Sequence, residues 1–241
     1  MLSVVEKFAL RNWQLRSLEG PLELNQRIFD LFLSAPFDIL TDFKGPHGPN
    51  RKSGRGKEHP RYGRFIYALA RFYEPELVVE VGTYCGGTAT GWARGMVENG
   101  KGKLICIDND TYTQGAYPWI AQENLSKTGI ASDRFELMCG DSKQIVYQLA
   151  DHLREQVDIY LVDGDHTYEG ALADIKSGLP MLKRHGLVLV HDVDRGRRMD
   201  ESTQAHPHPV YEAFTDTIKE YGFSWVILKF IRKHLGIIQV N

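Results

Sequence analysis

Short apolar runs alternate with apolar stripes at helical spacing over most of this chain. The runs are rich in Val, Ile and Leu, which is typical of strands buried on both faces. The expected strands are Leu77–Val81, Leu104–Asp108, Phe135–Cys139, Val157–Val162, Leu187–His191, Ser224–Phe230 and Gly236–Val240. Strands that alternate with helices predict an α/β fold, a doubly wound, mostly parallel, Rossmann-like sheet of these seven strands.

Apolar residues that recur every three or four positions predict the helices between these strands. The stripes lie within Ala89–Val97, Ile145–Leu153, Ala171–Leu182 and Val210–Tyr221. Pro180 falls inside the third stripe and is expected to kink that helix. Only Ile231–Leu235 separates the last two strands, which is too short for a crossover helix. The last strand should therefore pair as an antiparallel hairpin with the strand before it.

The pattern differs over the first sixty residues. The segments Val5–Trp13 and Leu24–Phe32 follow helical spacing, and a glycine- and proline-rich basic loop runs from Asp42 to about Pro60. We therefore predict N-terminal helices and a basic loop over residues 1–60, followed by a ligand-binding domain over 61–241. The basic stretch 44–57 fits two interpretations equally well: a solvated loop, or a lid that closes over a ligand.

Composition narrows the possible functions. The chain has 241 residues, of which 42% are hydrophobic, and its 29 basic and 31 acidic residues leave a net charge of −2. This balance disfavours a nucleic-acid partner, and no apolar run is long enough to suggest a membrane segment. Cys85, Cys106 and Cys139 have no metal-ligand spacing. Reduced thiols and the absence of a signal-like N-terminus are expected of a cytoplasmic protein.

A glycine-rich turn follows the first predicted strand of the domain. Its pattern is Glu80-x-Gly82-x-x-x-Gly86, and Tyr84 stands where a dinucleotide fingerprint needs its second glycine. A pyrophosphate would therefore fit poorly, which disfavours a nicotinamide-dependent oxidoreductase. An adenosyl ligand with an amino-acid tail fits better, because its ammonium can meet Glu80 and its carboxylate can meet backbone N–H groups. Asp108 ends the next strand, where it could accept both ribose hydroxyls or serve as an ordinary turn aspartate.

Ionisable residues crowd the ends of two later strands. Four acidic residues and two histidines follow the apolar runs 157–162 and 187–190: Asp163, Asp165, His166, His191, Asp192 and Asp194. Strand ends in a core rarely carry so many such groups without a cation or a substrate to offset them. We therefore expect the catalytic constellation here.

These motifs resemble a known group of enzymes. The turn Gly82-Thr-Tyr-Cys-Gly-Gly resembles motif I of the class I S-adenosylmethionine-dependent methyltransferases, in particular the catechol O-methyltransferase branch. The Asp-Gly-Asp-His segment at 163–166 and the later His-Asp pair are similar to those of small O-methyltransferases that act on macrolide sugars or cephalosporin-type scaffolds. The resemblance covers residues 77–194. It implies a methyltransferase sheet whose last strand is antiparallel.

The resemblance also implies roles for individual residues. The implied cofactor-binding residues are Glu80, Gly82, Thr83, Tyr84, Gly86, Asp108, Asp141, Ser142 and Asp163. Asp141 and Ser142 follow the strand 135–139, where the family's turn lines the adenine. Either residue could instead simply cap the helix that begins near Lys143.

For the metal, the resemblance implies Mg²⁺ or Mn²⁺ held by Asp163 and Asp192, with His191 at the third position. The catechol-type enzymes have an oxygen ligand where this chain has His191, and imidazole suits other metals better. Three alternatives therefore stay open: His191 is not a ligand, the metal is not magnesium, or no metal binds. His166 matches the position of a general-base lysine, and a neutral imidazole suits that role.

The resulting hypothesis is an S-adenosylmethionine-dependent O-methyltransferase of a small-molecule hydroxyl on a sugar, a phenol or a natural-product scaffold. Asp163 and His166 are the predicted catalytic residues. Two alternatives are a metal-independent N-methyltransferase and a non-catalytic cofactor-binding subunit. A homodimer through the exposed face of the N-terminal helices is a family-level expectation.

Overall fold

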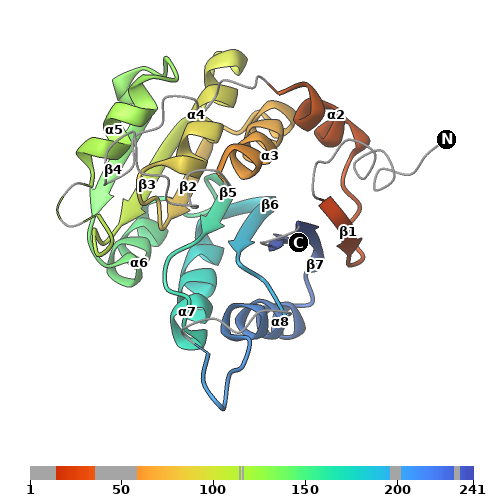
Figure 1. The fold of residues 1–241 in the computed structure, drawn as a ribbon. Coiled ribbons are helices and arrows are strands. Elements are labelled where there is room, and N and C mark those ends of the chain that lie inside the picture. The colour runs from red at the N-terminus through yellow and green to blue at the C-terminus, as the bar shows by residue number, and fades with distance from the viewer. Residues whose placement is uncertain (1–14, 36–58, 114, 116, 196–201, 231–233) are drawn as a thin grey trace. The chain divides into compact units, whose positions relative to one another are not determined.

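The computed structural model describes residues 15–35, 59–113, 115, 117–195, 202–230 and 234–241 (Figure 1). The predicted helix over Val5–Trp13 lies outside the described residues. So does the basic loop, except for its last two positions, which begin a helix. The described residues fall into two compact units, Leu24–Ser142 and the remainder. The predicted division at residue 60 stays a prediction.

The unit Leu24–Ser142 contains a purely parallel set of strands. Its strands are β2 (Leu77–Val81), β3 (Lys103–Asp108) and β4 (Phe135–Cys139). Its helices are α2 (Gln26–Ser34), α3 (His59–Tyr73), α4 (Gly87–Asn99), α5 (Trp119–Ser126) and the 3₁₀ turn η3 (Ser132–Arg134). β3 pairs with β2 on one side and with β4 on the other. The register places Val81 beside Ile107 and Asp108 beside Cys139, so the carboxyl ends of the three strands are level.

Helices α3 and α4 approach each other closely because α4 carries glycines on the contact side. A Cβ on Gly91 would lie 2.5 Å from the carbonyl oxygen of Gly63, and one on Gly95 would lie 2.4 Å from Cβ of Ala70. Trp92, beside Gly91, is fully buried. The glycines therefore lower helix propensity in α4 but permit a packing distance that alanine would prevent.

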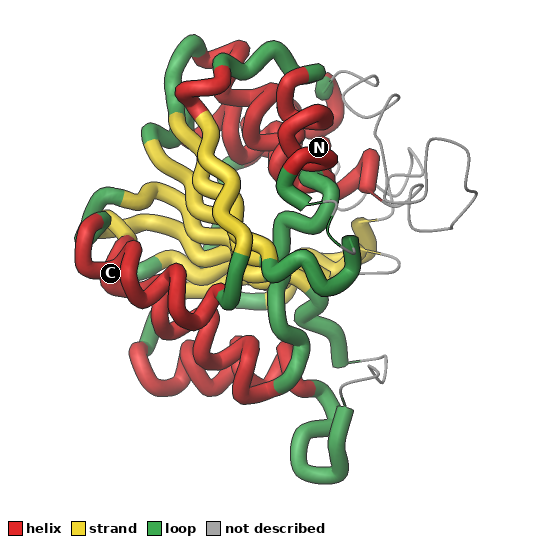
Figure 2. The backbone as a smooth tube through the Cα atoms, turned by 90° about the vertical axis from the view of Figure 1, so that its left-hand side faces the viewer, coloured by secondary structure: helices red, strands yellow, loops and turns green. Residues whose placement is uncertain are grey.

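The second unit has a mixed sheet. Its strands are β1 (Leu15–Glu19), β5 (Val157–Val162), β6 (Leu182–His191), β7 (Ser224–Phe230) and β8 (His234–Gln239), in the order β1-β7-β8-β6-β5. β5 and β6 are parallel, whereas the other neighbours are antiparallel. Its helices are α6 (Ser142–His152), α7 (Tyr168–Gly178) and α8 (Pro209–Tyr221). Helices α7 and α8 pack side by side (Figure 2).

The mixed α/β architecture and the terminal antiparallel hairpin β7–β8 confirm the predictions. Three details were wrong. Eight strands are described instead of seven, because β1 adds an edge strand in a region for which only helices were predicted. β6 begins at Leu182, before the predicted Leu187, because the polar residues between them extend along the strand. Pro180 does not kink a continuous helix: α7 ends at Gly178 and the chain passes into the 3₁₀ turn Leu179–Met181.

No described helix combines the length and the apolar character that a membrane crossing requires.

Candidate functional site

The glycine-rich turn after β2 folds back onto β3. The backbone N–H groups of Gly82 and Thr83 both donate to the carbonyl of Ile107, at 2.9 and 3.3 Å. Gly82 and Gly86 have φ angles of 82° and 83°, which glycine adopts without steric cost, and Tyr84 has a φ of 53°. Residues other than glycine rarely adopt this left-handed backbone region, and they are strained when they do. This turn delivers the chain to the start of α4.

Two carboxylates flank the turn. Glu80, on β2, is completely buried, and its Oε1 accepts a hydrogen bond from Thr88 Oγ1 at 2.7 Å. Asp108, at the end of β3, accepts from the backbone N–H of Tyr84 at 2.7 Å and from that of Asp110 at 2.8 Å. Asp108 therefore braces the turn from the end of β3.

Asp110, two residues after Asp108, is engaged in its own loop. Its Oδ1 accepts from the backbone N–H of Tyr117 at 3.1 Å and makes a short contact with the hydroxyl of Thr113. Tyr117 in turn donates its hydroxyl to the carbonyl of Cys106 on β3, at 2.9 Å. Asp110 thus folds the segment that leaves β3.

The turn after β4 lies at the same level as Asp108. The backbone N–H of Gly140 donates to the carbonyl of Asp108 at 2.9 Å, and Gly140 has a φ of 155°. Asp141 is exposed, and Ser142 is the first residue of α6, one position earlier than the sequence suggested. The predicted cofactor residues of this unit therefore follow the carboxyl ends of three adjacent parallel strands, where α/β sheets bind ligands.

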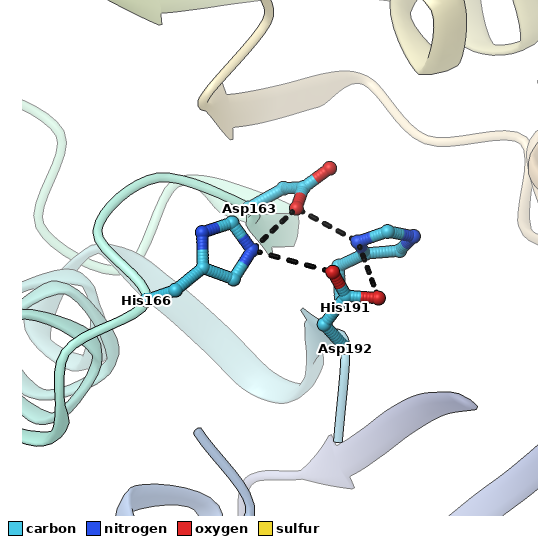
Figure 3. Close-up of side chains that lie close together, drawn as sticks. All are labelled: Asp163, His166, His191 and Asp192. Carbon is cyan, nitrogen blue, oxygen red and sulfur yellow. Dashed lines mark ion pairs between the residues drawn. The ribbon is translucent and has the colours of Figure 1, made fainter. Parts of the chain in front are cut away.

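Four side chains converge in the second unit, and Figure 3 shows them facing one another. Asp163 and His166 follow β5, His191 ends β6, and Asp192 comes directly after it. One ligand atom from each of the four lies within 4.8 Å of the others. His191 Nδ1 is 2.8 Å from Asp163 Oδ1 and 3.4 Å from Asp192 Oδ1. His166 Nε2 is 3.4 Å from Asp163 Oδ1 and 3.5 Å from Asp192 Oδ2.

The pairing of β5 with β6 creates this convergence. Val162 is the register partner of Val190, so Asp163 and His191 leave the sheet side by side. Asp192 then takes a left-handed φ of 57°, and its carbonyl accepts from the backbone N–H of Asp194 at 2.8 Å. Such a backbone conformation persists in a non-glycine residue only where its surroundings hold it, and it is common at functional sites.

The electrostatics of the cluster keep a proton on His166. Burial alone would lower the pKa of His166, but hydrogen bonds and charge from Asp163 and Asp192 outweigh it and raise the pKa to about 10. Burial would raise the pKa of Asp163, yet the positive charge of His191 and the contacts with His166 hold that pKa well below its usual range. Without a metal, the cluster is therefore an ion-pair network of carboxylates and imidazolium.

Asp165 and His206 have partners outside the cluster. Asp165 accepts from the backbone and hydroxyl of Thr167 and from Lys143. His206 stacks on Tyr168 with ring centroids 3.8 Å apart, and its Nδ1 lies 2.7 Å from Glu212 Oε2. His206 thus fastens the segment before α8 onto α7, and it does not join the cluster.

The structure groups the predicted site residues into two sets, one in each unit. The turn residues and the carboxylates Glu80 and Asp108 belong to one set, together with Asp141 and Ser142. Asp163, His166, His191 and Asp192 form the other, and the predicted cofactor contact of Asp163 stays a prediction. Sequence reasoning missed Thr88, whose hydroxyl engages Glu80. A polar residue in the first turn of a helix after a glycine-rich loop could have indicated it.

Comparisons with known proteins show that this chain is similar to methyltransferases. Residues 79–193 match the model of a family described as a methyltransferase domain. A protein of Mycobacterium sp. (strain JLS), provisionally named an O-methyltransferase, is 30% identical over 149 residues, which cover 62% of this chain and 63% of that protein. A catechol O-methyltransferase of Niastella koreensis is 25% identical over 146 residues, or 60% of this chain and 62% of that protein. The matches thus span just under two thirds of these relatives' lengths.

Solved structures support the fold. A SAH-bound methyltransferase of Podospora anserina aligns over 100% of this chain and 98% of its own, with a TM-score of 0.62 and 16% identity. An O-methyltransferase of Streptomyces achromogenes involved in tomaymycin synthesis, solved with SAM, aligns over 91% of this chain and 92% of its own, with a TM-score of 0.58 and 15% identity. At these identities the likeness establishes the Rossmann-like methyltransferase fold alone.

Proposed function

We propose that this chain, whose residues 79–193 match the model of a methyltransferase domain, transfers a methyl group from S-adenosylmethionine to a hydroxyl oxygen of a small molecule. One observation carries the proposal. The carboxylates of Glu80 and Asp108 lie at the ends of adjacent parallel strands, on either side of a left-handed glycine-rich turn that begins a helix. That arrangement offers partners for an ammonium, a ribose and a carboxylate at once.

Each cofactor residue has a role that its surroundings support. Glu80 meets the ammonium of the methionine moiety, because a fully buried carboxylate favours a cationic partner. Asp108 accepts from the ribose hydroxyls while Tyr84 and Asp110 hold its orientation. Thr83 and Gly86 shape the backbone that faces the amino-acid tail. Asp141 and Ser142 line the adenine from the turn after β4.

The second set of residues holds a divalent cation. Asp163 and Asp192 supply carboxylate oxygens and His191 supplies Nδ1, all within the distance that one ion could bridge after small side-chain movements. An imidazole beside two carboxylates suits Mn²⁺ better than Mg²⁺, although both ions accept this mixture of ligands. A bound cation would lower the pKa of the acceptor hydroxyl and fix the orientation of its oxygen.

His166 is the proposed general base. Its Nε2 faces both carboxylates, and in the metal-free cluster their charge keeps it protonated. A cation bound to these carboxylates would offset their charge and so lower the pKa of His166, and Nε2 could then accept the proton of the acceptor hydroxyl. Asp163 and Asp192 then have two functions: they hold the cation and they orient the base. Methyl transfer itself depends mainly on placing the two reactants in line.

Calorimetry tests the proposal without knowledge of the acceptor. S-adenosylmethionine is titrated into metal-stripped protein, and the titration is repeated with Mg²⁺ and with Mn²⁺; NAD⁺ serves as the control ligand. We expect micromolar binding of S-adenosylmethionine, no binding of NAD⁺, and a separate saturable heat for the metal. Absence of S-adenosylmethionine binding under all conditions would overturn the proposal. Binding of S-adenosylmethionine together with no saturable heat for either metal ion would overturn only the metal-assisted part and favour the metal-independent alternative.

A further inference from the structure

Asp165 lies between two members of the proposed site in the chain, yet its carboxylate contacts residues outside the cluster. Its Oδ1 accepts from the backbone N–H of Thr167 at 2.9 Å and from the Thr167 hydroxyl at 2.8 Å. Its Oδ2 accepts from Lys143 Nζ at 3.0 Å. Asp165 therefore closes a hydrogen-bonded turn around His166, the single residue between Asp165 and Thr167.

The start of helix α7 is built to accommodate this carboxylate. Thr167 is the N-cap of α7, and its hydroxyl accepts from the backbone N–H of Gly170 at 3.0 Å. A Cβ on Gly170 would lie 2.0 Å from Cγ of Asp165 and 2.1 Å from its Oδ2. Only glycine at position 170 leaves room for the Asp165 side chain over the first turn of the helix.

The imidazole of His166, in the middle of the same turn, faces the carboxylates of the cluster. His166 directs Nε2 to Asp163 on one side and to Asp192 on the other, at nearly equal distances (Figure 3). A histidine on a free loop would populate several backbone and side-chain conformations. The fixed turn around it removes much of that freedom before any ligand binds.

We propose that Asp165 is a positioning residue: it fixes the backbone of His166 so that the imidazole faces Asp163 and Asp192. This inference rests on the proposed function, because it assigns Asp165 to the same metal and base site. The pair with Lys143 is half-exposed and contributes little to folding stability. The effect of Asp165 should therefore appear at His166 rather than in the unfolding transition.

The test compares Asp165→Ala, Asp165→Asn and Gly170→Ala with a matched control, Asp158→Ala. Asp158 lies on β5 and also pairs with a lysine, Lys183, at 2.9 Å, but far along the strand from Asp163. Two readouts are used: the imidazole NMR signals of His166 in metal-free protein, and the dissociation constant for Mn²⁺. Thermal unfolding confirms that each variant is folded.

We expect Asp165→Ala to shift and broaden the His166 signals and to weaken Mn²⁺ binding by less than loss of a direct ligand does, because His166 contacts the ligands Asp163 and Asp192 but is not one of them. Asp165→Asn keeps an oxygen for Thr167 and should restore most of the wild-type behaviour. Gly170→Ala should resemble Asp165→Ala although Asp165 is still present, and Asp158→Ala should change neither readout.

The two proposals fail in different ways. Unchanged His166 signals in folded Asp165→Ala protein would overturn the positioning role, whether or not metal binds. Wild-type protein that binds no Mn²⁺ would count against the proposed metal site, while the metal-free NMR comparison would still decide the role of Asp165.

Discussion

His191 Nδ1 lies 2.8 Å from Asp163 Oδ1, although Asp163 follows β5, His191 ends β6 and the whole of α7 lies between them in the chain. The parallel register of β5 and β6 brings them together. Because each residue continues directly from a buried strand, neither can move far without disturbing the sheet. The cluster is therefore preorganised by the core, and its chemistry can be tested by conservative substitutions.

Asp163→Asn should abolish high-affinity binding of Mn²⁺. The change removes the carboxylate that contacts both histidines but keeps the side-chain volume. Loss of a direct ligand should cost more than the roughly 10- to 100-fold that follows loss of an outer partner. The measurement is a calorimetric titration with Mn²⁺, and Asp158→Asn on the same strand is the control. Wild-type affinity in Asp163→Asn would rule out this residue as a ligand.

Metal-free protein should lose stability at alkaline pH because of His166. Its folded pKa is raised to about 10, above the unfolded value of about 6.5. The stabilisation is therefore complete below the unfolded pKa and is lost as the pH rises through the folded pKa. Urea unfolding in chelator should show a gap in unfolding free energy between wild type and His166→Asn near neutrality, and a smaller gap above the folded pKa. A gap that stayed constant across this range would contradict the ion-pair network.

The same network predicts how the free energy of unfolding changes at acidic pH. The pKa of Asp163 is held below its usual range, so its contribution is present above the unfolded pKa of about 3.9 and disappears as the pH falls through the folded value. Wild type and Asp163→Asn should therefore converge in unfolding free energy under strongly acidic conditions. Urea titrations of the two proteins in chelator over the acidic range measure this directly. Stabilities that diverge towards low pH would refute it.

Glu80→Gln should weaken binding of S-adenosylmethionine. The substitution keeps an oxygen for Thr88 but removes the negative charge from a fully buried position. Loss of a hydrogen bond to a charged group costs about 1.5–3 kcal/mol, which corresponds to roughly 10- to 100-fold in affinity. Calorimetry gives the dissociation constant, and Glu136→Gln on the exposed side of β4 is the control. Equal affinities for both variants would show that Glu80 does not meet the ammonium.

Gly91→Ala should destabilise the fold although alanine is the better helix former. The new methyl group would lie 2.5 Å from the carbonyl oxygen of Gly63 and 3.1 Å from Cγ2 of Ile66. Overpacking of this kind costs about 1–3 kcal/mol, whereas helix propensity alone would add about 1 kcal/mol of stability. Urea unfolding shows whether the substitution lowers or raises the free energy of unfolding. Arg94→Ala removes one i,i+4 ion pair on α4 and should cost no more than about 0.5 kcal/mol.

The local sequence pattern determined several strands of this protein and its glycine-rich turn. Leu77–Val81, Phe135–Cys139 and Val157–Val162 were predicted with the bounds that the structure has, because a short run rich in apolar residues and bounded by polar or glycine residues specifies a strand locally. The glycine-rich turn could also be predicted from the sequence, since the left-handed backbone at Gly82 and Gly86 favours glycine. The proximity of Asp163 and His166 follows from their short spacing in the chain.

Other features were decided only by the tertiary structure. The meeting of Asp163 with His191 depends on the register of β5 against β6, and β1 exists because it can pair with the edge of β7. Whether Asp165 faces the cluster or holds the turn around His166 depends on the space above Gly170. Hydrophobic periodicity is a property of neighbouring residues, so it determines which segments become strands. Pairing and packing join residues that are distant in the chain, and they therefore decide which side chains those strands bring together.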